Sequence, residues 1–190
     1  MPLELLLSSG TALPITRWGH PVLHRLSQPV TEFGPELWNL LCDMFATNTA
    51  ANGAGLAAPQ VGVDLAVFIY DCLDGFGRLR QGLVCNPQIA LAVQPDLNAD
   101  YEGCLSLPGA YLSVARPDFA ICQGQDQFGE PVTMKGTGMF ARCLQHETDH
   151  VNGIVMEDHL SPSERRDLRR QHRRIATDYP EDWPASPRLS

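Results

Sequence analysis

Residues 145–153 contain the feature that most constrains this chain, the stretch QHETDHVNG, in which two histidines lie four positions apart and a glutamate follows the first. Residues i and i+4 share a face of a helix, so His146 and His150 could hold one metal ion, with Glu147 beside it as a proton carrier. A catalytic metal site needs a third protein ligand and an open position. The pattern therefore predicts a metal-binding helix and raises the question of the third ligand.

The composition is that of one globular domain, because 44% of the 190 residues are hydrophobic and 19% are charged. We expect a single domain over residues 1–176 and a flexible, proline-rich tail over residues 177–190. The formal net charge of −8 argues against a protein that coats DNA with its whole surface. The sequence contains no run of about 18 apolar residues, so we expect no membrane-spanning segment.

Six cysteines could form three disulfides, but two observations argue against this. The chain opens without a basic segment followed by a long apolar run, and it exceeds the usual size of a disulfide scaffold. We therefore expect reduced cysteines and a cytoplasmic protein, and we expect it to be a monomer.

Apolar spacing and turn residues predict short strands and few helices. A helix is expected to begin at Pro35, and the metal-binding helix is expected over residues 138–152, capped by Thr137 and ended by Gly153. Strands are expected at residues 65–70, 83–89 and 111–115, a hairpin at residues 119–123 and 131–134, and irregular structure at residues 1–14, 51–62 and 93–100. The pattern favours an α+β fold of mostly antiparallel short sheets packed around a central metal-binding helix, with a C-terminal helix.

Three interpretations of the histidine pair remain open from the residues alone. The pair could occur by chance on an ordinary helix. It could belong to a zinc protease, although Met156 stands where one protease pattern has a third histidine, and neither Glu157 nor Glu164 lies in a convincing second-helix motif. Alternatively, the third ligand could be Cys104 within residues 102–106, EGCLS, where the neighbouring glycine lets the backbone approach a metal. A lone cysteine is, however, more often a small buried hydrophobic residue.

Two further motifs accompany the histidine pair. Residues 53–60, GAGLAAPQ, fit G-x-G-x-A-A-x-Q, residues 102–106 fit E-G-C-x-S, and residues 146–150 fit H-E-x-x-H. Each motif is weak alone, but the three in this order resemble the peptide deformylase family over about residues 15–160. The resemblance implies a metal-dependent hydrolase that removes the N-formyl group from the formylmethionine of nascent polypeptides and releases formate.

The resemblance also implies a role for each residue of the site. The implied metal ligands are Cys104, His146 and His150. They would hold one divalent ion, commonly ferrous iron in this family, with nickel or zinc as alternatives. Metal-bound hydroxide would attack the formyl carbon, with Glu147 as general base and then general acid. The side-chain amide of Gln60 and the backbone N–H of Leu105 would stabilise the oxyanion. The intact Glu147 and Gln60 argue against a purely structural metal protein.

Further residues are expected to bind the substrate. Gly55 resembles the position whose backbone pairs with the main chain of the substrate as an added strand, and Gly103 is expected to help in the same way. Ala54 stands where the family more often has a branched apolar residue, which predicts a roomier pocket for the methionine side chain. The charge pair Glu102 and Arg116 could support the metal-ligand loop, although two unrelated surface charges are equally compatible with the sequence.

The wall of the methionine pocket is expected on the metal-binding helix. Met139, Cys143 and His146 share one face of that helix at helical spacing. Arg142 lies at the edge of this face, where its stem could line the pocket while its charged head reaches water.

The last expected helix, which opens with a capping box at Ser161, is rich in arginine. Its arginines are Arg165, Arg166, Arg169, Arg170, Arg173 and Arg174. Leu168 and Ile175 fall on the opposite side and would dock the helix to the body. Deformylases act on chains that leave the ribosome, so the resemblance implies contact between this helix and ribosomal RNA near the exit tunnel.

Overall fold

A computed structural model of the protein describes residues 1–90, 92 and 95–189. The helices are α1 (Leu3–Ser8), α2 (Pro35–Ala51), α3 (Gly138–Val151) and α4 (Pro162–Ile175), and the 3-10 turns are η1 (Pro21–His24), η2 (Ala58–Val61), η3 (Met156–His159) and η4 (Ala176–Asp178). The strands are β1 (Gly55–Ala57), β2 (Val67–Leu73), β3 (Leu79–Ala90), β4 (Leu97–Gly103), β5 (Tyr111–Pro117), β6 (Phe119–Gln125) and β7 (Pro131–Thr137).

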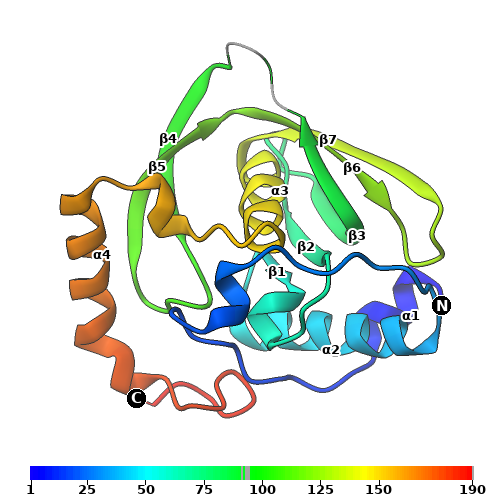
Figure 1. Ribbon diagram of the computed structural model, residues 1–190, viewed down its shortest axis with the longest axis horizontal. Helices are drawn as coiled ribbons and strands as arrows, with labels where there is room; N and C mark the ends of the chain where they lie inside the picture. Colours follow the sequence, from blue (N-terminus) through cyan, green and yellow to red (C-terminus); the bar gives the residue numbers. More distant parts are fainter. Residues whose placement is uncertain (91, 93–94, 190) are drawn as a thin grey trace.

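The strands form two antiparallel sheets around a central helix. Five of them pair in the order β1-β2-β3-β6-β7, and β4 pairs with β5 as a separate ribbon. Figure 1 shows α3 in the centre of the molecule, between the five-stranded sheet and the β4–β5 ribbon. The predicted α+β fold of antiparallel sheets around a central helix, with a helix near the C-terminus, is confirmed.

Both faces of β2 are buried, and this strand therefore connects the two halves of the core. Successive side chains of a strand point to opposite faces. Val67 and Ile69 pack in the cluster that contains the apolar face of α2, whereas Phe68 and Tyr70 pack in the cluster that contains the apolar face of α3. Consequently α2 covers one face of the five-stranded sheet and α3 covers the other, so that α3 lies near the middle of the protein (Figure 1).

The bounds of α3 agree with the prediction, although one of its expected caps differs. Thr137 precedes the helix, but its side chain makes no capping hydrogen bond within the described residues. Gly153 follows the helix with φ of +74°, and a Cβ atom at this position would lie 2.5 Å from the backbone of Arg25. Only glycine combines the left-handed conformation with this close approach, so Gly153 ends the helix as predicted.

Three segments that were expected to be irregular form regular structure instead. Residues 3–8 form α1, whose Leu6 is buried against α2. Residues 55–57 form β1, because β2 supplies the pairing that three small residues could not specify alone. Residues 97–103 form β4, whose side chains are mostly exposed and therefore lack the alternation of a half-buried strand. Residues 93 and 94 of the expected connection lie outside the described residues.

The remaining predicted elements are confirmed with adjusted ends. The helix at Pro35 and the strands β2, β3 and β5 are present, and β6 and β7 form the predicted hairpin. All six cysteines are free, as expected. Within the described residues, no helix has both the length and the apolar character needed to cross a membrane.

The C-terminal part of the chain packs on the body. Ser161 forms the predicted capping box with Glu164, and Leu168 is fully buried against the β4–β5 side of the molecule. The segment after α4 turns back beneath the body (Figure 1). Trp183 in this segment is only 7% exposed and joins the core cluster of α2.

Candidate metal centre

The turn that follows β4 brings Cys104 beside the two histidines of α3. Cys104 Sγ lies 3.2 Å from His150 Nε2, which in turn lies 3.2 Å from His146 Nε2. The three potential ligand atoms all lie within 4.8 Å of one another. Burial alone would raise the pKa of the Cys104 thiol, but the two neighbouring imidazoles lower it well below its ordinary value. A thiolate and two imidazoles suit a divalent first-row metal ion.

The glutamates that a peptidase would use as a third ligand are engaged elsewhere. Glu157 accepts hydrogen bonds from the guanidinium of Arg169, at 2.9 and 2.8 Å. Glu164 accepts from the backbone N–H of Ser161 at the start of α4. The geometry therefore favours Cys104 among the alternatives that the sequence left open.

Glu147 projects from α3 toward β1, where close packing requires a glycine. A Cβ atom at Gly55 would lie 2.8 Å from Glu147 Oε1 and 2.7 Å from Cys143 Sγ. Burial raises the pKa of Glu147 to about 7. Its Oε2 atom is buried and has no hydrogen-bond partner among the described residues. A carboxylate with a free oxygen beside a metal site is suited to accept and return a proton.

A buried ion network behind the three candidate ligands holds His146 in place. Arg116 donates from Nε and Nη2 to the two carboxylate oxygens of Glu102, each at 2.7 Å, and from Nη1 to Asp149 at 2.8 Å. His146 Nδ1 lies 2.7 Å from Glu102 Oε1. Burial would raise the pKa of Glu102, but the hydrogen bonds from Arg116 and His146 outweigh it and hold that pKa well below its usual range. An ionised Glu102 orients the His146 ring with Nε2 toward the other ligands.

The suggested pair of Glu102 and Arg116 is therefore confirmed, whereas the expected placement of Arg142 is wrong. The guanidinium of Arg142 does not reach water. It is buried and donates to Glu102, to the carbonyl of Val114 and to the carbonyl of Asn98, each at 2.9 Å. Arg142 is thus a second buried cation beside Arg116. It pairs with carboxylate and carbonyl acceptors that would be costly to bury without a donor.

The other expected site residues surround the ligands. Gln60 Oε1 accepts from the backbone N–H of Ala57 at 2.8 Å, which orients its Nε2 toward Ser106 Oγ at 3.4 Å and Cys104 Sγ at 3.7 Å. Cys143 Sγ donates to the carbonyl of Ala54 at 3.3 Å. A hydrogen bond with Cys72 and burial raise the pKa of the Cys143 thiol well above its ordinary value, so the thiol stays neutral as part of an apolar wall.

A cleft of about 280 Å³ opens beside this cluster, and His150 is not among the residues that line it. The expected residues that line it are Ala54, Gly55, Gln60, Gly103, Cys104, Leu105, Met139, Arg142, Cys143, His146 and Glu147. The strands beside the cleft are edges of their sheets, since β1 pairs only with β2 and β4 only with β5 among the described residues. The cleft therefore offers two strand edges to an extended peptide.

Residues 12–166 match the family described as polypeptide deformylase. The chain belongs to the peptide deformylase family. Peptide deformylase 1 of Streptomyces avermitilis is 51% identical over 173 residues, which cover 90% of this chain and 80% of that protein. The crystal structure of a peptide deformylase from Legionella pneumophila matches with a TM-score of 0.79 at 37% identity and covers 90% of this chain and 100% of that one. The peptide deformylase from Thermus thermophilus matches with a TM-score of 0.74 at 34% identity, over 86% of this chain and 99% of that one.

Membership of the deformylase family confirms the predicted family, fold and enzyme class. The sequence analysis nevertheless missed part of the cleft wall. The missed residues that line the cleft include Tyr101, Tyr111, Pro108, Tyr179 and Trp183. Tyr101 directly precedes the E-G-C-x-S motif, which could have signalled it. Tyr179 and Trp183 lie outside the residues that match the family, so no motif marked them.

Proposed function

We propose that this deformylase removes the N-formyl group from formylmethionine at the start of nascent polypeptides and releases formate. The observation that carries the proposal is the convergence of three parts beside one cleft. These parts are a thiol with two imidazoles within metal-binding distance, a buried carboxylate with a free oxygen, and an oriented amide donor. The two strand edges beside them suit a peptide substrate bound in an extended conformation.

We propose Cys104, His146 and His150 as the ligands of one divalent ion, natively ferrous iron, with nickel or zinc as replacements. When bound, such an ion activates water near neutral pH and polarises the formyl carbonyl. The protein supplies the orientation of the ligands, because Glu102 fixes the ring of His146 through Nδ1.

The reaction needs proton transfer and stabilisation of charge at defined atoms. Glu147 takes a proton from the attacking water at its free oxygen and delivers it to the nitrogen of the departing amine. Gln60 Nε2 and the backbone N–H of Leu105 donate to the oxygen that becomes negative when the formyl carbon is attacked. Loss of one such donor typically lowers the rate by about 10²–10³-fold.

The remaining cleft residues bind the peptide. The backbone of Gly55 pairs with the main chain of the substrate at the open edge of β1, and Gly103 contributes from the edge of β4. Met139, Cys143 and Ala54 form the apolar wall for the methionine side chain, and the buried Arg142 holds the base of this wall in place.

The direct test is formate release from a formyl-Met peptide by the metal-loaded protein, compared with the Glu147→Gln variant. The variant keeps all three ligand side chains, so it should bind metal stoichiometrically while turnover falls by about 10²-fold or more. Metal content and formate are measured on the same samples. Absence of formate release by the metal-replete wild type would refute the function, and near-normal turnover by the variant would refute the role of Glu147.

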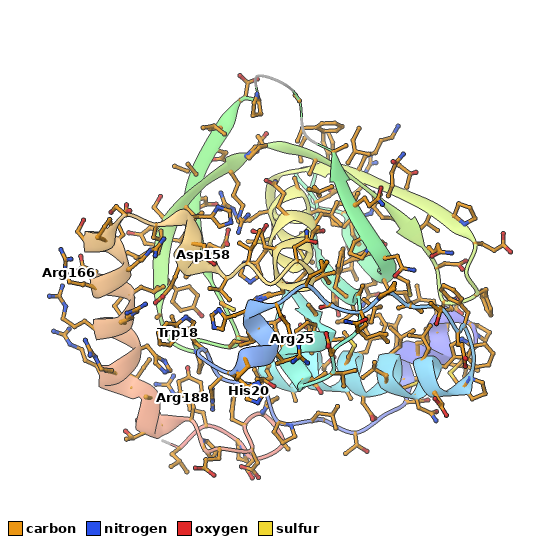
Figure 2. The ribbon with its side chains drawn as sticks, in the orientation of Figure 1. Trp18, His20, Arg25, Asp158, Arg166 and Arg188 are labelled. Carbon is orange, nitrogen blue, oxygen red and sulfur yellow. The ribbon has the colours of Figure 1, made fainter. Side chains whose placement is uncertain are left out.

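We also propose that the arginine face of α4 binds ribosomal RNA near the exit tunnel. Figure 2 shows Arg166 projecting outward from α4, away from the body. Three of the six arginines have partners within the protein. Arg165 donates to the carbonyl of Leu160, Arg169 pairs with Glu157, and Arg170 pairs with Asp167 on the surface of α4. Arg166, Arg173 and Arg174 are exposed and concentrate positive charge on one side of an acidic protein.

Co-sedimentation with ribosomes tests this contact. Changing Arg166, Arg170 and Arg173 to glutamine together should reduce co-sedimentation at low salt and leave formate release from short formyl peptides intact. Wild-type binding should fall with salt at a log–log slope of about −0.7 to −0.9 per phosphate contact. Co-sedimentation that is insensitive to salt, or that the triple variant retains, would show that α4 is only a surface helix.

A further inference from the structure

The segment that follows α4 is anchored to the body at several points. The carbonyl of Trp183 accepts from the backbone N–H of Ile15 at 2.9 Å, and Arg17 Nη2 donates to the carbonyl of Pro180 at 2.9 Å. Near its end the segment folds back on itself, where the backbone N–H of Leu189 donates to the carbonyl of Asp178 at 2.7 Å. Residues 176–189, called the tail segment below, therefore pack on the body of the protein, although they lie beyond residues 12–166 that match the family.

Two aromatic side chains of the tail segment line the catalytic cleft. Tyr179 and Trp183 belong to the wall of the same cleft as Cys104 and Glu147. A Cβ atom at Gly109 would lie 3.4 Å from the ring of Tyr179, which places this ring against the turn before β5. On the other side, both aromatic residues share an adjoining hollow with Ala51 at the end of α2. The tail segment thus connects the two rims of the cleft.

The two rings present a fixed surface. They stack edge to face, with centroids 5.1 Å apart. The guanidinium carbon of Arg17 lies 5.9 Å from the centroid of Tyr179 and 5.4 Å from that of Trp183, and Arg188 lies 5.2 Å from the centroid of Tyr179. Cations near aromatic faces hold the rings in place without filling the cleft between them and the catalytic residues.

The edge of β1 shows how a peptide would reach this surface. Gly55 lies beside Glu147, where the formyl group would react. After Gly55 the backbone is not accessible to a peptide, because Ala57 and Ala58 are fully buried. Residues 51–55, in contrast, line the cleft. An extended peptide along this edge must therefore run from Gly55 toward Ala51. Ala51 ends α2 and Asn52 is left-handed, so these four residues span less than the about 14 Å of a fully extended chain. The third or fourth residue of an extended peptide covers such a distance.

We infer that Tyr179 and Trp183 form an aromatic subsite that favours an apolar or aromatic side chain at the third or fourth residue of the formylated peptide. The inference rests on the proposed deformylase function and adds a specificity determinant outside the residues that match the family. The wall for the methionine side chain is formed by Met139 and Cys143 of α3 together with Ala54, and so by different residues. The preference at the first residue of the peptide should therefore be separable from the preference at its third or fourth residue.

The test compares formyl-Met-Ala-Ala-Ala with the same peptide carrying phenylalanine at the third or the fourth position. In the wild type, phenylalanine at one of these positions should raise kcat/KM by about three- to tenfold, the gain expected from one aromatic contact. The ratio of kcat/KM for the phenylalanine peptide to that for the alanine peptide should fall to about one in Tyr179→Ala. Tyr179→Phe should retain the wild-type ratio, because the ring and not the hydroxyl makes the contact. Phe128→Ala is the matched control, since it removes an aromatic ring at the β6–β7 turn outside the cleft.

The outcomes separate the inference from the function on which it rests. If the wild type releases no formate from any of the peptides, the proposed function fails. If it releases formate but the phenylalanine ratio is near one, or is unchanged in Tyr179→Ala, only the subsite is refuted. Thermal unfolding shows whether Tyr179→Ala is folded, and Tyr179→Leu replaces it if it is not. Quenching of tryptophan fluorescence by Met-Ala-Ala-Phe, lost in Trp183→Phe, supports the subsite independently of turnover.

Discussion

The helices α3 and α4 have the same length, fourteen residues each, but opposite relations to water. Eleven residues of α3 are buried, including two histidines, a glutamate and an arginine, whereas Leu168 is the one buried residue of α4. Both helices are rich in charged or titratable groups. The difference lies in their partners, because the buried polar groups of α3 contact groups from β1, β4, β5 and the Cys104 turn, while most of the charges of α4 face solvent.

This comparison shows that the charges of the two helices serve different purposes. A buried charge is tolerated only when its partners are in place, so each such group on α3 fixes the geometry of its neighbours. An exposed charge imposes almost no geometry and is free to meet a separate partner. Substitutions on α3 and its partners should therefore affect the metal and the fold, whereas most substitutions on α4 should not.

The largest effect is expected from Cys104→Ser, which removes the proposed third ligand beside the two histidines of α3. A hydroxyl is a poor substitute for a thiolate, so the variant should fail to retain stoichiometric metal and should lose turnover with it. The loss of affinity should exceed the about 10–100-fold that follows from losing a group that only orients a ligand. Metal content after gel filtration measures this effect, with Arg170→Gln as the control on α4. Full retention of metal by Cys104→Ser would mean that the third ligand lies elsewhere.

The next effect concerns the ion network behind the proposed ligands. Arg116→Leu leaves the buried carboxylate of Glu102 without its bidentate partner, and breaking a buried pair in this way typically costs about 3–5 kcal/mol of stability. Combining it with Glu102→Gln should recover part of the loss, because the uncompensated charge is then gone. Urea unfolding of the two single variants and the double variant measures the coupling. Strictly additive losses would show that the pair does not act as a unit.

The same contrast explains what could be predicted from the sequence. The helix around His146 was predicted with its end at Gly153, because a local motif, helical spacing and a required glycine all point to it. The approach of Cys104 was implied by the resemblance to deformylases and not by spacing, since 42 positions separate it from His146 and only the β4–β5 ribbon brings them together. The buried position of Arg142 was missed because its acceptors, on β4 and β5, are contributed by the tertiary fold.

Segments without a repeating pattern were missed for a similar reason. β1 consists of three small residues and exists because β2 pairs with it, while β4 exposes most of its side chains and shows no alternation. The tail segment looked unstructured by composition, yet Tyr179 and Trp183 anchor it against Arg17. Aromatic residues in a proline-rich tail are therefore a reason to expect docking.

The smallest effect is expected between two neighbouring arginines of α4, and it tests the comparison most finely. Arg169 pairs with the buried carboxylate of Glu157 and lies 4.5 Å from the ring centroid of Trp18, whereas Arg170 pairs with the exposed Asp167. Arg169→Gln leaves Glu157 without its charged partner and should cost about 1–2 kcal/mol. Arg170→Gln should change the free energy of unfolding by less than about 0.5 kcal/mol.

Both variants remove one positive charge from the same turn of the same helix, so differences in net charge and helix propensity largely cancel. Urea unfolding at two salt concentrations measures the effect. The loss in Arg169→Gln should persist at high salt, because screening is weak for a partly buried pair. We expect that a charge contributes to stability according to the burial of its partner and not according to the helix on which it lies. Equal losses of unfolding free energy in the two variants would contradict this. A larger loss in Arg169→Gln would extend the rule derived from α3 to the arginine of α4 whose charged partner is buried.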